Sequence, residues 1–273
     1  MFNLNSEILK SNSRRWNFEE LSVIIEETEN RFNDVVVKSD QKDYQSLLTD
    51  FFGKAVLYTK EALTLLYQGY ADGAISLSKE LFETSVLLSF FEQHKDEEDI
   101  FERYFDNIEL SSISDSMLLL SFLKDGATDD ATKTSLSDMT ERKKRTYSGL
   151  KTKYKDFLID GSFRPYWYLG NVLEDKSFYG IMKNTAWDKT VFKHIYNMTK
   201  HSGHNAVNPS DSDDVAAVMT NPSTEGFQIP VCFTVTSFIN ISKIVFANDG
   251  IDFSDIENRL NGIIKPLFSE IWK

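Results

Sequence analysis

The amino-acid sequence predicts an all-α protein: a bundle of long and short helices, around nine in number, with no sheet of consequence. Apolar residues recur every three or four positions along most of the chain, which is the period of an amphipathic helix. The alternation of apolar and polar residues that marks a strand is scarce. With 273 residues, of which 41% are hydrophobic, the chain can bury one large core or two close-packed ones.

The N-terminal part of the chain carries two apolar stripes. The first, from Phe18 to Phe32, predicts an N-terminal helical segment within residues 1–40. We expect residues 41–273 to form the bundle core, either as a separate domain or as one domain with that segment. The second stripe, from Tyr44 to Leu65, predicts a long helix that ends near Gly69.

The middle of the chain predicts further helices. A helix from about Gly73 to Gln93 is expected to form an antiparallel hairpin with the preceding one. Two short helices fit Asp99 to Glu109 and Ser114 to Lys124. A long charged helix fits Asp129 to Leu158, and the segment "DGSFRP" ends it. Another helix fits Trp187 to His201.

The C-terminal part predicts three more helices. A short one ends near Met219 and is capped by Asp211 or Ser212. The last two are expected over Ile229 to Ala247 and over Ser254 to Trp272, and Pro266 is expected to bend or interrupt the second.

Composition points to a cytoplasmic protein. The single Cys232 has no disulfide partner, and the N-terminus lacks the apolar core of a signal peptide. The apolar run from Phe227 to Ala247 contains several polar side chains that would be stranded in lipid, so we expect no membrane span. The motifs that bind nucleotide cofactors are absent, and no cofactor is expected.

A basic segment interrupts the acidic chain, whose net charge is −12. The stretch "ERKKRTYSGLKTKYK" is either a solvated helix face or a strip that contacts phosphates. The residues that would contact nucleic acid in the second case are Arg142, Lys143, Lys144, Arg145, Lys151 and Lys153.

Glu83 is the first candidate for a functional side chain. On a helix it lies between the apolar residues Val86, Leu87 and Phe90, so we expect its carboxylate to be at least half buried. A buried carboxylate needs a partner, either Lys79 one turn earlier or a group from across the core.

The stretch "YNMTKHSGH" is the second candidate. On a helix, Tyr196, Lys200 and His204 lie on one face, with His201 beside His204. Four interpretations remain open. The set acts as acid and base on a phosphodiester, or the histidines bind a ligand phosphate or carboxylate without reaction. In the third, the histidines and two carboxylates hold a metal. In the fourth, His204 pairs with Glu83 or ends the helix. The ligands of a metal would be His201, His204, Glu80 and Glu83.

Three segments resemble the domain of unknown function 5677 family of helical bacterial proteins. They are "AISLSKELFETSVLLSFF", "WYLGN" and "SFYGIMKNTAWDKTVFKHIYNMTKHSGH". Leu81, Phe82 and Glu83 match that family's Arg-x-Leu-Phe-Glu-like core, and Trp167 matches its Trp-containing turn. Two further matches, Tyr196 and His204, fall in its last motif, whereas Lys79 and Lys200 depart from the pattern. The resemblance implies a helical fold and a pairing of Glu83 with His204.

The histidine stretch also resembles, more distantly, the HEPN ribonucleases. These helical bundles use an Arg-x(4–6)-His motif at a helix end, usually across a dimer. The nearest match here is Lys200 with His204, and lysine lacks the planar two-pronged fork of arginine. The resemblance implies a metal-independent ribonuclease.

These observations give two functional expectations. The first is a HEPN-like protein of the toxin or phage-defence kind that cleaves RNA or acts on a nucleotide. Its catalytic residues would be Tyr196, Lys200, His201, His204 and Glu83. The alternative is a non-catalytic helical module that recognises a protein partner or a small ligand. A homodimer is expected because the many Phe, Tyr and Trp residues are difficult to bury in one chain.

Overall fold

The computed structural model describes residues 16–36, 43–170, 172–190, 193, 196 and 227–271. Within these residues the protein is all-α, as the sequence predicted, with eight α-helices and a single two-stranded sheet. The chain forms two compact units. Unit 1 comprises residues 1–94 and 182–273, and unit 2 comprises residues 95–181.

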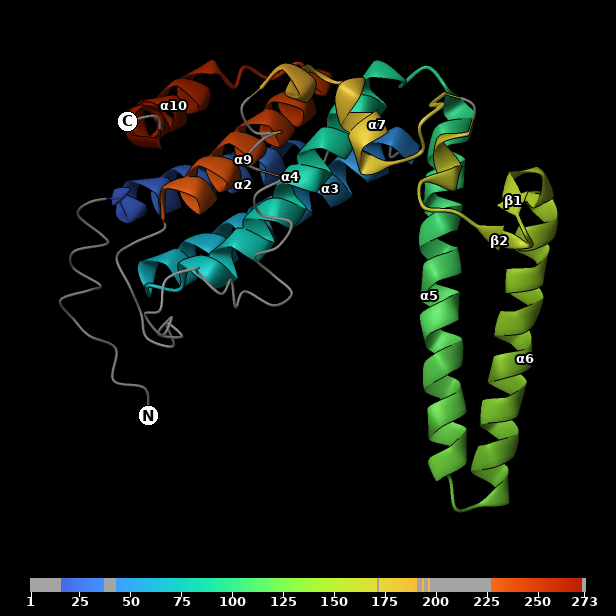
Figure 1. Cartoon of the computed structure of the whole chain (residues 1–273). Helices are drawn as coiled ribbons and strands as arrows, with labels where there is room; N and C mark the ends of the chain where they lie inside the picture. The colour runs from blue at the N-terminus through green and yellow to red at the C-terminus, as the bar shows by residue number, and fades with distance from the viewer. Residues whose placement is uncertain are drawn as a thin grey trace, which may run out of the picture. The chain divides into compact units, whose positions relative to one another are not determined.

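Unit 1 is a helical bundle whose long helices lie side by side (Figure 1). The expected hairpin is present, because α3 and α4 pack against each other and are joined by a short turn at Gly69. The long helices are α2 (Phe18–Val36), α3 (Asp43–Tyr67), α4 (Ala71–Gln93), α9 (Gln228–Asn248) and α10 (Ser254–Ile271). α2 packs against α3 and α10, so the segment expected within residues 1–40 belongs to the same unit as the core.

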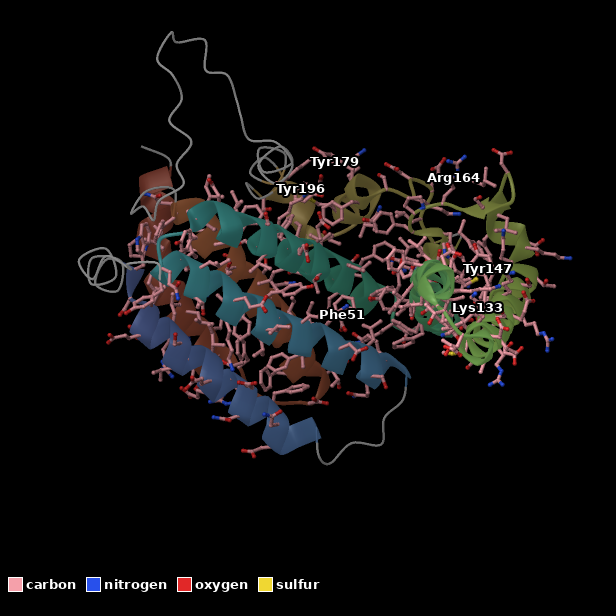
Figure 2. The ribbon with its side chains drawn as sticks, turned by 90° about the horizontal axis from the view of Figure 1, so that it is seen from below. Phe51, Lys133, Tyr147, Arg164, Tyr179 and Tyr196 are labelled. Atoms are coloured by element: carbon pink, nitrogen blue, oxygen red, sulfur yellow. The ribbon has the colours of Figure 1, made fainter. Side chains whose placement is uncertain are left out.

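The core of unit 1 lies between α3, α4 and α9 and is rich in phenylalanine. Phe51 of α3, which is labelled in Figure 2, packs edge-on against Phe91 of α4. Phe52 contacts both Phe238 and Phe246 of α9. Aromatic pairs of this kind add to the free energy gained from burying their area.

A row of polar contacts joins α4 to α9 inside this core. The hydroxyls of Ser78 and Thr234 lie 2.8 Å apart. About two turns further along α4, the side-chain amide of Asn240 donates to the hydroxyls of Ser85 and Ser89, each at 2.9 Å. Buried polar groups that satisfy one another in this way specify which sides of two helices meet.

The helix α9 is long and apolar enough, by length and composition alone, to cross a membrane. Most of its side chains are buried against α3, α4 and α10. A helix that is apolar on all sides is equally suited to the centre of a globular core. The following helix α10 continues through Pro266 to Ile271.

Unit 2 is built on a long antiparallel helix pair, α5 (Glu98–Gly126) and α6 (Asp130–Lys153) (Figure 1). Asp129 caps α6, since its carboxylate accepts a hydrogen bond from the backbone of Thr132 at 2.7 Å. Lys153 and Tyr154 close the other end of the pair, because both bind the carboxylate of Asp106.

Two expectations for unit 2 were wrong. The short helices expected over residues 99–109 and 114–124 form one helix, α5, because Leu110 and Ile113 are buried and keep the intervening serines helical. The charged helix ends at Lys153 and not at Leu158. A hairpin of β1 (Leu158–Ile159) and β2 (Ser162–Phe163) follows it. Its turn residues Asp160 and Gly161 both have positive φ, which suits a tight Asp-Gly hairpin.

The shorter elements complete the chain. They are η1 (Lys155–Phe157), η2 (Trp167–Leu169), α7 (Phe178–Lys183) and η3 (Ala186–Lys189). Of the helix expected from Trp187 to His201, the structure describes the residues to Thr190, with Lys193 and Tyr196 beyond them. The short helix expected to end near Met219 lies outside the described residues.

A pair of glycines tests the packing of unit 2. A Cβ on Gly180 would lie 1.9 Å from the backbone oxygen of Asp175, whereas one on Gly149 in α6 would meet nothing within 4 Å. We expect Gly180→Ala to lower the free energy of unfolding by about 1–3 kcal/mol through overpacking. Gly149→Ala adds the same methyl group and should raise the free energy of unfolding by about 0.5–1 kcal/mol, because glycine destabilises the interior of a helix. Denaturant titration of both variants measures the difference, and equal effects would contradict this packing.

The contact of Tyr154 with Asp106 predicts a loss of stability at alkaline pH. Burial, together with the hydrogen bond to Asp106, raises the pKa of Tyr154 to about 12. A tyrosine in the unfolded chain titrates near pH 10, so the folded state holds this proton more tightly. The resulting stabilisation is complete below about pH 10 and is lost as the pH rises to the folded pKa.

We therefore expect Tyr154→Phe to be less sensitive than the parent to alkaline pH between about pH 10 and 12. Unfolding curves at several pH values measure this sensitivity for both proteins. Lys153 also has a raised pKa because it binds Asp106 and Glu102, so some alkaline loss remains in the variant. Identical pH dependence in the two proteins would show that the Tyr154 hydroxyl does not contribute to the loss of stability at alkaline pH.

Candidate functional site

The candidate site lies on α4 of unit 1, where Glu83 meets Tyr196. The Tyr196 hydroxyl donates a hydrogen bond to Oε1 of Glu83 at 2.7 Å. Figure 2 shows Tyr196 beside this helix. The side chain of Glu83 is 35% exposed, so its carboxylate is partly buried, in keeping with the apolar residues around it in the sequence. This contact joins the first residue of the histidine stretch to α4.

Lys79 is the third polar member of the site. Its ammonium lies 3.9 Å from Oε1 of Glu83, one helical turn away, and 5.6 Å from the centre of the Tyr196 ring. An ion pair at this spacing and exposure stabilises a helix only weakly. Glu83 therefore has a local cationic partner and a second partner from a distant part of the chain.

Aromatic packing holds the pair in place. Phe82, the residue before Glu83, is fully buried and contacts Trp187, Tyr196 and Phe233. Because consecutive helical residues point about 100° apart, burying Phe82 turns Glu83 toward the edge of the core. Tyr196 is itself 5% exposed, so its ring joins the core while its hydroxyl reaches the carboxylate. The sequence indicated Glu83 and Tyr196 but gave no sign that Trp187 and Phe233 support them.

The other residues of the histidine stretch, Lys200, His201 and His204, lie outside the described residues. The metal interpretation therefore rests on Glu80 and Glu83 alone within the described structure. Glu80 lies near Tyr58 of α3, whose pKa is raised by burial and further by the charge of Glu80. The described residues contain no group of three or more His, Cys, Asp or Glu side chains that could hold a metal ion.

The basic strip lies on α6 in unit 2, and two of its six expected contact residues are paired with carboxylates. Lys144 binds Glu141 at 2.9 Å, and Lys153 binds Glu102 and Asp106, both at 2.7 Å. Lys151 lies over the ring of Tyr147, which is labelled in Figure 2. The remaining residues, Arg142, Lys143 and Arg145, form no carboxylate ion pair within the described part of the chain.

Trp167, which matches the family's turn motif, has a structural role in unit 2. It is buried, its indole NH donates to the side-chain oxygen of Asn107 at 2.7 Å, and its ring packs on Tyr154 and Phe163. These contacts tie the segment that follows the β-hairpin to α5. Trp167 is thus explained by packing.

The hydrogen bond between Tyr196 and Glu83 can be measured by a double-mutant cycle with Tyr196→Phe and Glu83→Ala. We expect a coupling free energy of about 1 kcal/mol, because each change removes one half of the same partly buried contact. The cycle of Tyr58→Phe with Glu83→Ala serves as the control, because Tyr58 interacts with Glu80. Additive effects in both cycles would contradict the contact.

Comparisons with known proteins complete the description of the site. A profile described as "Family of unknown function (DUF5677)" matches residues 45–210. The comparisons with curated proteins and with solved structures gave no match. The matched region includes Glu83, Tyr196 and the histidine stretch, together with the whole of the α5 and α6 pair. Because it covers more than half of the chain, the chain belongs to the DUF5677 family.

Proposed function

We propose that this chain acts on RNA or on a nucleotide, as a HEPN-like protein of the toxin or phage-defence kind. In this proposal His204 is the acid or base, Lys200 neutralises the phosphate, and Tyr196 or His201 orients the reacting group. Glu83 holds Tyr196 in position through the hydrogen bond at 2.7 Å. That hydrogen bond is the observation that carries the proposal, because it ties Tyr196, the first residue of the histidine stretch, to α4.

The chemistry of RNA cleavage fits the residue types of the histidine stretch. A base removes the proton of the ribose 2′-hydroxyl, whose oxygen attacks phosphorus, and an acid protonates the departing 5′-oxygen. Histidine is suited to both steps because its pKa lies near neutrality. A lysine beside it supplies the positive charge that stabilises the phosphorane transition state. This mechanism uses only side chains of the protein.

The exposure of the polar site supports a role with a substrate. The side chains of Lys79 and Glu83 are 29% and 35% exposed, so both are accessible to a bound molecule, whereas Tyr196 is buried behind them. The unpaired cations of α6 also favour a polyanion, since Arg142, Lys143 and Arg145 add positive charge to an otherwise acidic chain. Lys144 and Lys153 contribute less because carboxylates neutralise them.

A second proposal is a non-catalytic module that recognises a protein partner or a small ligand. It is favoured by the exposed apolar side chains of α5, among which Leu118 and Phe122 are 75% and 76% exposed. Large apolar side chains that gather on a surface are typical of sites that bind another molecule. Under this proposal, Tyr196 and Glu83 form a purely structural contact.

One variant separates the two proposals. We expect His204→Ala to abolish RNA cleavage by the intact chain, and also growth arrest if the protein is a toxin. The melting temperature should change by no more than a few degrees, because a histidine that meets a substrate is accessible to solvent under this proposal and its loss costs under about 1 kcal/mol. Gel analysis of labelled RNA and thermal unfolding measure both properties on the same preparation.

The control for this experiment is His94→Ala. His94 lies at the end of α4, where its ring packs on Phe90, and it has no part in the proposed site. This variant should keep full activity. Cleavage that survives His204→Ala, or a parent protein with no activity on any RNA, would leave the binding module as the better proposal. A large loss of stability in His204→Ala would instead indicate that His204 is a structural partner of Glu83.

A further inference from the structure

An apolar patch on α5 of unit 2 has no partner within the described part of the chain. We define the α5 patch as Leu118, Leu119, Phe122 and Leu123. These side chains are 75%, 58%, 76% and 46% exposed. Four large apolar side chains within six consecutive residues form a contiguous exposed surface, which is uncommon on a monomeric protein.

The α5 patch lies largely on a different side of its helix from Leu110, Ile113 and Leu120, the residues that the C-terminal part of α5 buries. Leu110, Ile113 and Leu120 are buried, and α6 is the helix that packs along α5. At 100° per residue, Phe122 points away from Ile113, and Leu119 points away from Leu110. Its margin at Phe122 and Leu123 borders a hollow that Thr132 and Leu136 of α6 also line. Leu118 and Leu119 add apolar surface beyond the contact that holds the helix pair together.

The α5 patch is suited to pairing with a second copy of itself. If two α5 helices pack antiparallel around a two-fold axis near residue 120, Leu118 of one copy lies opposite Phe122 of the other. The same contact then occurs twice, which is how a closed two-fold dimer uses a single surface. The polar residues Ser111, Ser112 and Asp115 precede the patch on that side and supply a polar rim.

The exposed area agrees with a weak dimer. A fully exposed aromatic side chain presents roughly 200 Å² and a leucine less, so the α5 patch offers at most about 500 Å² on each copy. A standard stable interface buries about 800 Å² per partner, and weak ones bury less. From this patch we infer that the chain forms a two-fold homodimer through antiparallel α5 helices, with a dissociation constant in the micromolar range. This inference does not depend on the proposed function.

The test is the molar mass of the full chain over a range of concentrations, measured by analytical ultracentrifugation. We expect a reversible shift from 31.4 kDa toward twice that mass as the concentration rises. Phe122→Glu should raise the dissociation constant at least about tenfold, because the dimer would bury a charge without a partner. Its circular dichroism should match that of the parent, since Phe122 is mostly exposed in one copy.

The matched control is Leu57→Glu, which places the same charge at a site on α3 that is 52% exposed. This variant should dimerise as the parent does. A cysteine introduced near the two-fold axis tests the antiparallel pairing of the two α5 helices. The natural Cys232 does not interfere, because it is buried. Under mild oxidation Leu119→Cys should form a disulfide-linked dimer, and Leu57→Cys should not. A parent that stays monomeric at high concentration, or a dimer that Phe122→Glu leaves intact, would overturn the inference.

Discussion

The contact between α4 and α9 is the interaction on which unit 1 depends. Ser78 meets Thr234, Ser85 meets Asn240, and a further hydrogen bond joins Glu92 to Asn248 at 3.0 Å. The α4 residues follow one another at intervals of seven, and their partners advance along α9 in the same direction. The two helices therefore run parallel, with polar groups repeating along a shared apolar seam. Since α9 is apolar on nearly all sides, these hydrogen bonds fix which of its sides faces α4.

The orientation of α4 also determines the candidate site. Once Phe82 is buried against Phe233 of α9, the next residue, Glu83, must point to the edge of the core. Trp187 and Tyr196 also pack on Phe82, and this packing brings the Tyr196 hydroxyl to the carboxylate. The polar site is thus a consequence of core packing, because the same aromatic cluster that fills the core positions its hydrogen-bonding groups.

Unit 2 is held together with much less buried apolar surface than unit 1. None of the residues of α6 is buried, so this helix is held along one side by α5 and at its ends by polar contacts. Asp106 binds both Lys153 and Tyr154, and the Trp167 cluster packs at the same end. A helix pair with so little core leaves apolar surface unsatisfied, and the α5 patch is that surface. In the inferred dimer, a second copy would cover apolar surface of unit 2 that the described residues of one chain leave exposed.

The sequence by itself determined the all-α class and most of the described long helices, because apolar periodicity and capping residues such as Asp129 act within a few turns of one segment. It did not determine that α5 is one continuous helix. It also indicated Glu83 and Tyr196 as candidates, since a carboxylate among apolar neighbours needs a partner. Only the tertiary structure decided that these two residues meet, because they are separated by 113 positions. The parallel pairing of α4 with α9, whose contacts join residues 151 to 156 positions apart, was likewise not predictable. Helical periodicity shows which side of a helix is buried but not which distant segment covers it.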